Sequence, residues 1–298
     1  MWLFAALASR ILWSGCGATD QVLTRMHVQS RVFSVLVLNL CTYLPFGAVA
    51  YFLSAGIQWD MQTMLWCVGG QWIALVAVAP YYHCVQHEQS YNIIPYFEFT
   101  PVFLMLMAAA FLGETLAPLQ ILGAAIVILC GFAFSWDFAH GRIKRNILAW
   151  MCLSSLCYAF FQMCLKKAGT VEDAFAVAFY ITVSEGVTGF IALFFLPRVR
   201  QSIMATMRAS KGRSLHLSML TSGLAFMGLV SITYAFQQAP TAGHVAALSG
   251  TQPFFAFALA VMLGRLLPGH FETIRLSRET KLKFFLIAGI FAGVYLLH

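Results

Sequence analysis

Charged residues are scarce in this chain. They make up 10% of its 298 residues, whereas hydrophobic residues make up 60%. A typical soluble domain is about 25% charged, so this chain lacks the polar residues that would cover a fold in water. It also lacks a long hydrophilic domain, since its longest hydrophilic stretches, 198–216 and 265–283, span 19 residues each. We therefore expect a protein whose solvent is the lipid of a membrane.

The cysteine patterns of metal and disulfide sites are also missing. The eight cysteines form no CxxC pair and no cluster, so neither a zinc site nor a disulfide framework is predicted. One group has ligand-like spacing, because His83 and His87 stand four residues apart and Glu88 follows them. We interpret this group as a solvated loop and expect neither a metal nor a cofactor.

Long apolar runs dominate the rest of the sequence, and ten of them reach the length of about 20 residues that a helix needs to cross a membrane. They span residues 2–22, 32–53, 61–82, 92–112, 118–136, 147–165, 174–196, 215–237, 243–264 and 282–297. We predict an all-α membrane protein with ten transmembrane helices. The first charge, Arg10, falls inside the first run, whereas a cleaved signal peptide carries positive charge before its apolar stretch. The first run is therefore expected to remain as a helix.

The sequence repeats itself at a constant offset of 152 residues. The matching pairs are Tyr82 and Tyr234, Gln86 and Gln238, Pro101 and Pro253, Phe103 and Phe255, and Ala108 and Ala260. This repeat predicts two halves, 1–140 and 141–298, with five helices each. Because five is odd, the second half is expected to insert upside down, as in secondary transporters built from inverted repeats. Pro95, Pro101 and Pro253 lack an amide donor and are predicted to be hinges.

Basic residues gather on one side of the membrane when the loops are assigned to alternate sides. That side receives fifteen Lys and Arg residues, and the other receives only Lys166 and Lys167. Positive residues favour the cytoplasmic side, so the loops after helices one, five, seven and nine are expected there, with both termini outside. We relate the net charge of +7 to anionic lipid headgroups and expect no nucleic-acid partner. A monomer or homodimer in the cell (inner) membrane is predicted.

Residues 97–136 read FEFTPVFLMLMAAAFLGETLAPLQILGAAIVILCGFAFSW. This segment resembles the end of an EamA-type repeat of the drug/metabolite transporter superfamily. A weaker second copy contains QPFF at 252–255, with Arg265 where the pattern usually carries Glu. The resemblance implies two inverted five-helix repeats, a central cavity, and transport driven by a gradient or by exchange. Ten-helix members mostly keep their termini in the cytoplasm, so the resemblance and the charges favour opposite orientations.

Three ionisable residues fall well inside the apolar runs, namely Arg10, Glu98 and Glu185. A charge at a helix centre costs about 2.5–3.5 kcal/mol on insertion scales, so such residues usually face the protein interior and have a function. One cation and two anions suit a proton, a sodium ion or an organic cation better than a free anion. A structural ion pair between Arg10 and one glutamate is the competing interpretation. Asp20, near the end of its run, is expected to be solvated at headgroup level.

The other candidate residues share helical faces with these charges. Ser14 and Gln21 follow Arg10 at helical spacing, and we predict that their side of the helix faces a cavity. The remaining candidates for substrate or proton binding are Trp13, Tyr96, Tyr158, Gln162, Thr182, His244 and Gln252. Packing between helices is the alternative for the small and hydroxyl residues, and a buried neutral imidazole is the alternative for His244.

These patterns predict a secondary active transporter of a small polar or amphipathic metabolite, preferably an amino acid, an amine or a cationic compound. Glu98 and Glu185 would bind a cation or proton in turn, and Arg10 would set their protonation or hold a substrate carboxylate. We expect an exporter coupled to protons or exchange, without enzyme activity. The alternatives are a transporter or flippase for a nucleotide sugar or lipid-linked sugar and, more remotely, an intramembrane enzyme.

Overall fold

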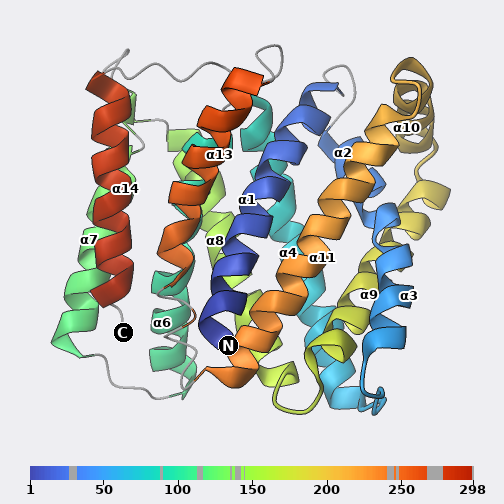
Figure 1. Ribbon diagram of the computed structural model, residues 1–298, viewed down its shortest axis with the longest axis horizontal. Helices are drawn as coiled ribbons and strands as arrows, with labels where there is room; N and C mark the ends of the chain where they lie inside the picture. The colour runs from blue at the N-terminus through green and yellow to red at the C-terminus, as the bar shows by residue number, and fades with distance from the viewer. Residues whose placement is uncertain are drawn as a thin grey trace.

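The computed structural model shows a bundle of helices, most of which run along one direction (Figure 1). It describes residues 1–26, 32–87, 90–112, 117–134, 136–137, 142–143, 145–239, 245, 248–266 and 278–296. Outside the helices, β1 (Trp136–Asp137) and β2 (Arg142–Ile143) form a short antiparallel pair. The predicted all-α class is confirmed.

The helices follow the apolar runs of the sequence closely. In the first half they are α1 (Trp2–Met26), α2 (Val32–Thr42), α3 (Leu44–Leu53), α4 (Met61–His87), α5 (Ser90–Ile93), the 3-10 helix η1 (Ile94–Glu98), α6 (Phe99–Leu112) and α7 (Pro118–Phe134). In the second half they are α8 (Arg145–Ala168), α9 (Ala174–Phe195), α10 (Pro197–Ala209), α11 (Arg213–Gln238), the 3-10 helix η2 (Leu248–Thr251), α13 (Gln252–Leu266) and α14 (Arg278–Leu296).

Within the described residues, five segments are long and apolar enough to cross a membrane. They are Phe33–Leu53, Met61–Gln86, Arg145–Ala168, Ala174–Phe195 and Arg213–Gln238. Large apolar side chains also cover the outside of the bundle, as with Phe52, Phe194 and Phe285, whose exposed fractions are 82%, 75% and 73%. An exposed apolar surface of this kind is typical of contact with lipid, so the structure is compatible with a membrane protein.

Two of the expected helices contain a 3-10 turn, and proline lies in or beside each of these turns. The run 92–112 divides into α5, η1 and α6, with Pro95 in η1 and Pro101 in the first turn of α6. A proline removes one backbone donor and crowds the preceding turn, which favours the tighter 3-10 turn at this point. The run 243–264 likewise shows η2 before α13, whose second residue is Pro253. α6 and α13 begin at Phe99 and Gln252, which are 153 residues apart, against the sequence offset of 152.

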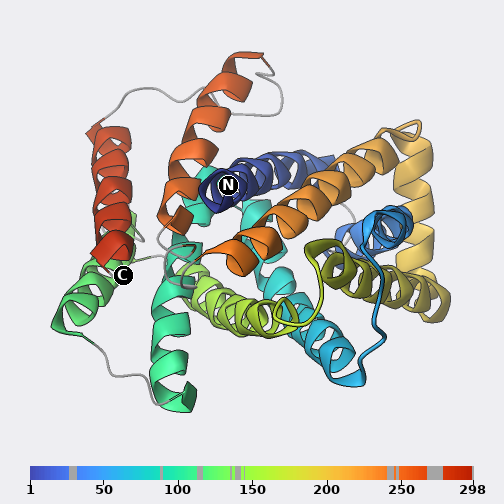
Figure 2. The same cartoon turned by 60° about the horizontal axis from the view of Figure 1, so that its bottom comes forward.

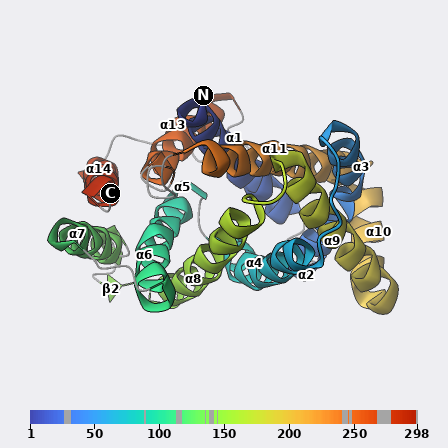
Figure 3. The same ribbon diagram turned by 90° about the horizontal axis from the view of Figure 1, so that it is seen from below.

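Helices of the first half pack mainly against helices of the second half (Figure 3). α1 packs along α11, and α4 packs along α8. α13 lies against α1, and α6 lies against α8. α2 contacts α9, and α7 contacts α14. The interior of the bundle is therefore formed jointly by the two halves.

One end of the bundle is formed by α10, which carries exposed arginine residues. α10 crosses one end at a steep angle to α9 and α11 (Figures 1 and 2). Its Ile203 is buried against Val37 and Leu38 of α2, whereas Arg200 and Arg208 are exposed. The N-terminus and the last turn of α14 lie at the opposite end (Figure 1).

Acidic side chains form hydrogen bonds between the two halves at the end of the bundle that carries the N-terminus. Asp173 caps α9 by accepting a hydrogen bond from the amide of Phe175 at 2.8 Å, and its other oxygen accepts one from the amide of Ala55 at 2.9 Å. Glu172 Oε1 accepts a hydrogen bond from the amide of Gln58 at 2.9 Å. These contacts join the segment before α4 to the turn before α9, so they connect the two halves.

Candidate substrate cavity

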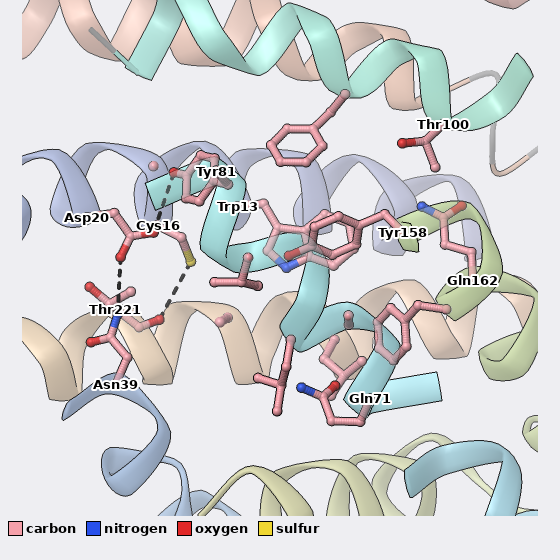
Figure 4. Close-up of a pocket in the computed structure, with 18 of the residues that line it drawn as sticks. Trp13, Cys16, Asp20, Asn39, Gln71, Tyr81, Thr100, Tyr158, Gln162 and Thr221 are labelled. Carbon is pink, nitrogen blue, oxygen red and sulfur yellow. Dashed lines mark hydrogen bonds between the residues drawn. The ribbon is translucent and has the colours of Figure 1, made fainter. Parts of the chain in front are cut away.

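A cavity of about 210 Å³ lies in the middle of the bundle (Figure 4). Its walls come from α1, α2, α4, η1 and α6 of the first half and from α8, α9, α11 and α13 of the second half. Its volume is below the roughly 300–1,000 Å³ of pockets that hold drug-sized ligands. The cavity is therefore suited to a small metabolite.

Many of the residues predicted from the sequence meet in this cavity. Those that line it are Arg10, Trp13, Glu98, Pro101, Tyr158, Gln162, Glu185 and Gln252. They belong to six different elements, η1 and five helices, so the fold is required to bring them together. Helical spacing along single runs identified the faces that point inward, and the structure shows that these faces share one space.

Other predicted residues pack between helices beside the cavity. The Ser14 hydroxyl donates its hydrogen bond to the carbonyl of Arg10 at 2.8 Å, and the carbonyl oxygen of Gln252 lies 3.3 Å from the same hydroxyl. Thr182 is fully buried and donates to the carbonyl of Ala178 at 2.7 Å. These hydroxyl groups satisfy backbone carbonyls of their surroundings, as the packing interpretation requires.

The other predicted residues lie near the two 3-10 turns or outside the described residues. Tyr96 is buried in η1, and its carbonyl accepts a hydrogen bond from Ser155 at 2.9 Å. Pro95 and Pro253 are buried in or beside the two 3-10 turns. His244 lies outside the described residues, as do Glu88 and the side chain of His87.

Arg10 and Trp13 form one wall of the cavity. The Arg10 side chain is only 3% exposed, and its guanidinium lies over the Trp13 ring at 5.1 Å from the centroid. Glu98, 1% exposed, acts on Arg10 electrostatically. Trp13 itself is held by close packing, because a Cβ atom at Gly228 would lie 2.6 Å from its Nε1 atom. Glycine on α11 therefore leaves the space that the indole occupies.

Glu185 and Gln71 form a second polar group. Gln71 Nε2 donates a hydrogen bond to Glu185 Oε1 at 2.6 Å, which connects α4 to α9. Gln71 is buried at 3% exposure, and Tyr158 also lines this part of the cavity. A short bond from an amide to a carboxylate is stronger than one between neutral groups, so it fixes the direction of the Glu185 side chain.

Asp20 forms a third polar group, and here the sequence prediction was wrong. Asp20 is not solvated at headgroup level, because it is 5% exposed and lines the cavity. Its Oδ1 atom accepts a hydrogen bond from the hydroxyl of Tyr82 at 2.9 Å. The same atom accepts one from Asn39 Nδ2 at 3.3 Å, which Figure 4 shows. The Tyr81 hydroxyl lies 3.5 Å from its Oδ2 atom. The inward face of α1 thus carries Trp13 and Asp20 besides Arg10.

The Asp20 group continues into a chain of hydrogen bonds that joins the two halves. Asn39 Oδ1 accepts a hydrogen bond from the hydroxyl of Ser218 at 2.5 Å. The Thr42 hydroxyl is bonded to those of Ser218 at 3.0 Å and Ser222 at 2.7 Å. α1, α2 and α4 are tied in this way to α11 at the cavity end nearer to α10. The chain of bonds depends on several helices at once, so no single run of sequence reveals it.

Carboxylates outnumber cations on the described cavity wall. The acids are Asp20, Glu98 and Glu185. Among the described lining residues, Arg10 is the one Lys or Arg. Aromatic rings supply much of the remaining surface, from Trp13, Tyr43, Tyr81, Tyr82, Phe97, Tyr158 and Phe161. Aromatic faces and carboxylates both attract cations. The wall therefore favours a ligand with a positively charged group and an apolar body.

Comparisons with known proteins identify the fold but not a family. No family model matches the sequence, and no curated protein matches it. Solved structures do match, and one, described only as the crystal structure of a protein, superposes with a TM-score of 0.59. The two sequences are 14% identical, and the alignment covers 97% of this chain and 96% of that chain. The similarity therefore shows that the two chains share a fold over nearly their whole length.

Proposed function

We infer that this chain is a secondary transporter that moves a small organic cation or zwitterion across a membrane by alternating access. The observation that carries this proposal is the central cavity, because both halves build it and its wall combines three carboxylates with aromatic rings. We further propose ten transmembrane helices in two inverted repeats, in keeping with the resemblance to EamA-type transporters.

The pattern of helix packing supports the inverted repeat. In the proposed repeat α1 corresponds to α8, α4 to α11 and α6 to α13. The pair α1 and α11 then corresponds to the pair α8 and α4, and the pair α1 and α13 corresponds to the pair α8 and α6. Both members of each set are packed together. The two 3-10 turns, η1 and η2, also correspond under this exchange. A pseudo-two-fold arrangement of this kind allows one half to rock against the other around a fixed central site.

The charges on the cavity wall support a cationic group on the cargo. An anionic nucleotide sugar would need several cationic side chains that face the cavity. The described part of the wall has one Lys or Arg residue, Arg10. Glu98 and Glu185 are the proposed partners of a substrate cation or of a proton. The tyrosine and tryptophan rings would bind the apolar body of the cargo.

The distribution of basic residues supports an orientation. The end of the bundle that carries α10 also contains Arg213, at the start of α11, and Arg145, at the start of α8. Under the positive-inside rule this end faces the cytoplasm. The N-terminus and the end of α14 would then face outward.

Transport by purified protein in sealed liposomes tests the proposal. The probes are radiolabelled tyramine, tyrosine and a nucleotide sugar, each measured with and without an imposed pH gradient. We expect tyramine or tyrosine to accumulate in protein-containing liposomes and the nucleotide sugar to stay outside, with empty liposomes as the control. Movement of the nucleotide sugar alone, or of none of the three, would contradict the proposal.

A further inference from the structure

The Arg10 guanidinium has unused hydrogen-bond donors inside the cavity wall. Its Nε and Nη2 atoms are buried and have no hydrogen-bond partner among the described residues. The side chain lines the cavity and is 97% buried. The guanidinium carbon lies 5.1 Å from the centroid of the Trp13 ring, and the guanidinium N–H groups point outward within their own plane. Arg10 therefore contributes two donors without a partner among the described residues to the wall of the cavity.

Buried donors without partners are unusual in proteins. Leaving such a group unsatisfied is costly, and more so when it is charged. Arginine cannot escape this cost by losing its proton, because the guanidinium stays charged in proteins. Glu98 provides electrostatic compensation, yet the two nitrogen atoms still lack an acceptor. A bound acceptor would remove this penalty.

The geometry of the two free atoms indicates which acceptor fits. Nε and Nη2 lie on one edge of the guanidinium plane, and each directs an N–H group to the same side. Two parallel N–H groups match the two oxygens of a carboxylate, which they bind as a bidentate pair. A single carbonyl or hydroxyl oxygen would leave one donor unused.

We propose that the substrate of this cavity is a zwitterion whose carboxylate binds Nε and Nη2 of Arg10 while its ammonium group faces the acidic side chains of the same wall. This proposal rests on the proposed transport function and narrows its cargo to amino-acid-like molecules. The excess of carboxylates, from Asp20, Glu98 and Glu185, accommodates the ammonium group. Rings such as those of Tyr158 and Phe161 bind the apolar side chain of the ligand.

Binding measurements on detergent-purified protein separate the carboxylate from the rest of the ligand. Three amino acids are compared with the amines that lack only the carboxylate: phenylalanine with phenethylamine, tyrosine with tyramine, and leucine with isoamylamine. 3-Phenylpropionate, which lacks the ammonium group, completes the set. We expect at least one amino acid to bind about tenfold or more tightly than its amine, and 3-phenylpropionate to bind more weakly than phenylalanine.

Substitution of Arg10 then assigns the preference to its donors. In Arg10→Gln the ratio of amino-acid to amine affinity should fall to within about twofold of one. Arg10→Lys keeps the positive charge but cannot present two parallel N–H groups, so it should restore only part of the ratio. Size-exclusion chromatography of each variant shows whether the protein is folded, and a misfolded Arg10→Gln leaves Arg10→Lys as the deciding variant.

Several outcomes would overturn the proposal, and they differ from a failure of transport. Equal affinity for amine and amino acid, an unchanged ratio in Arg10→Lys, or no binding of any of the three amino acids would each do so. Tight binding of 3-phenylpropionate alone would indicate an anion site. If the affinity ratio behaves as expected but liposomes show no uptake, the zwitterion site stands and the transport function fails. If tyramine is transported without any preference for a carboxylate, only the zwitterion site fails.

Discussion

The double variant Glu98→Gln, Glu185→Gln is expected to transport its substrate at least about a hundredfold more slowly than the unmodified protein. Each carboxylate lines the cavity and is replaced by an amide of nearly the same size. A hydrogen bond to a charged group contributes about 1.5–3 kcal/mol, and 1.4 kcal/mol corresponds to a factor of about ten. Losing two such interactions therefore costs a factor of about a hundred or more, before any loss of proton coupling.

The single variants and a matched control show whether the loss belongs to the cavity. Each single substitution should lower transport about tenfold. Glu172→Gln is the control, because Glu172 is also a buried glutamate but lies in the turn before α9, where an amide oxygen can still accept the hydrogen bond from Gln58. It should transport within about twofold of the unmodified protein. A double variant with normal transport would remove both carboxylates from the mechanism.

Asp20→Asn is expected to have the second-largest effect, by opening the end of the cavity that faces α10. Asp20 accepts hydrogen bonds from Tyr82, Asn39 and Tyr81. An asparagine at this position would replace one acceptor oxygen by an amide donor, so the Tyr81 hydroxyl would lose its acceptor, and an unsatisfied buried donor costs about 1–3 kcal/mol. Because this group of bonds joins α1, α2 and α4 to α11, its loss should weaken closure between the halves. We expect transport to fall about tenfold or more.

Two controls separate closure from general damage to the protein. Asp60→Asn makes the same chemical change at a partly buried position outside the cavity, where Asp60 accepts a hydrogen bond from the amide of Thr63 at 2.7 Å at the start of α4. Asparagine caps a helix about as well as aspartate, so transport should be unchanged. Tyr82→Phe removes the shortest bond to Asp20 and should reproduce part of the effect. If Asp20→Asn transports normally, the hydrogen-bonded group does not control closure.

The all-α class could be predicted from the sequence because a bilayer would limit the possible structures. Within a bilayer each backbone polar group must be satisfied inside the protein, so an apolar run of the right length becomes a helix. The places of the two 3-10 turns were also visible, since Pro101 and Pro253 stand at matching positions of the repeat. α10 was missed because residues 198–216 read as a hydrophilic loop, although Val199, Ile203 and Met207 follow one another at helical spacing and pack on the bundle.

The site was predicted only in part, for physical reasons. Arg10, Glu98 and Glu185 stand far inside apolar runs, where a charge must face protein, and the structure places all three around one cavity. Asp20 stands near a helix end, where sequence alone cannot distinguish water from a cavity that extends that far. Trp13 and Asp20 lie seven residues apart on the side of α1 that faces the cavity. Ser14 lies next to this side and packs against α13. Which side of α1 faces the cavity depends on the helices that pack against it and cannot be derived from the sequence of α1 alone.

The most direct test of alternating access is the labelling of Cys16 from the two sides of the membrane. Cys16 lines the cavity and is 9% exposed, and replacing the other seven cysteines with serine or alanine makes it the single target. A membrane-impermeant maleimide is applied to oriented vesicles from one side or the other, with and without a transported substrate. A substrate that moves between the sides should raise the labelling rate from one side and lower it from the other. If substrate leaves both rates unchanged, or if only a lipid-soluble reagent reaches Cys16, the cavity is not an alternately opened path.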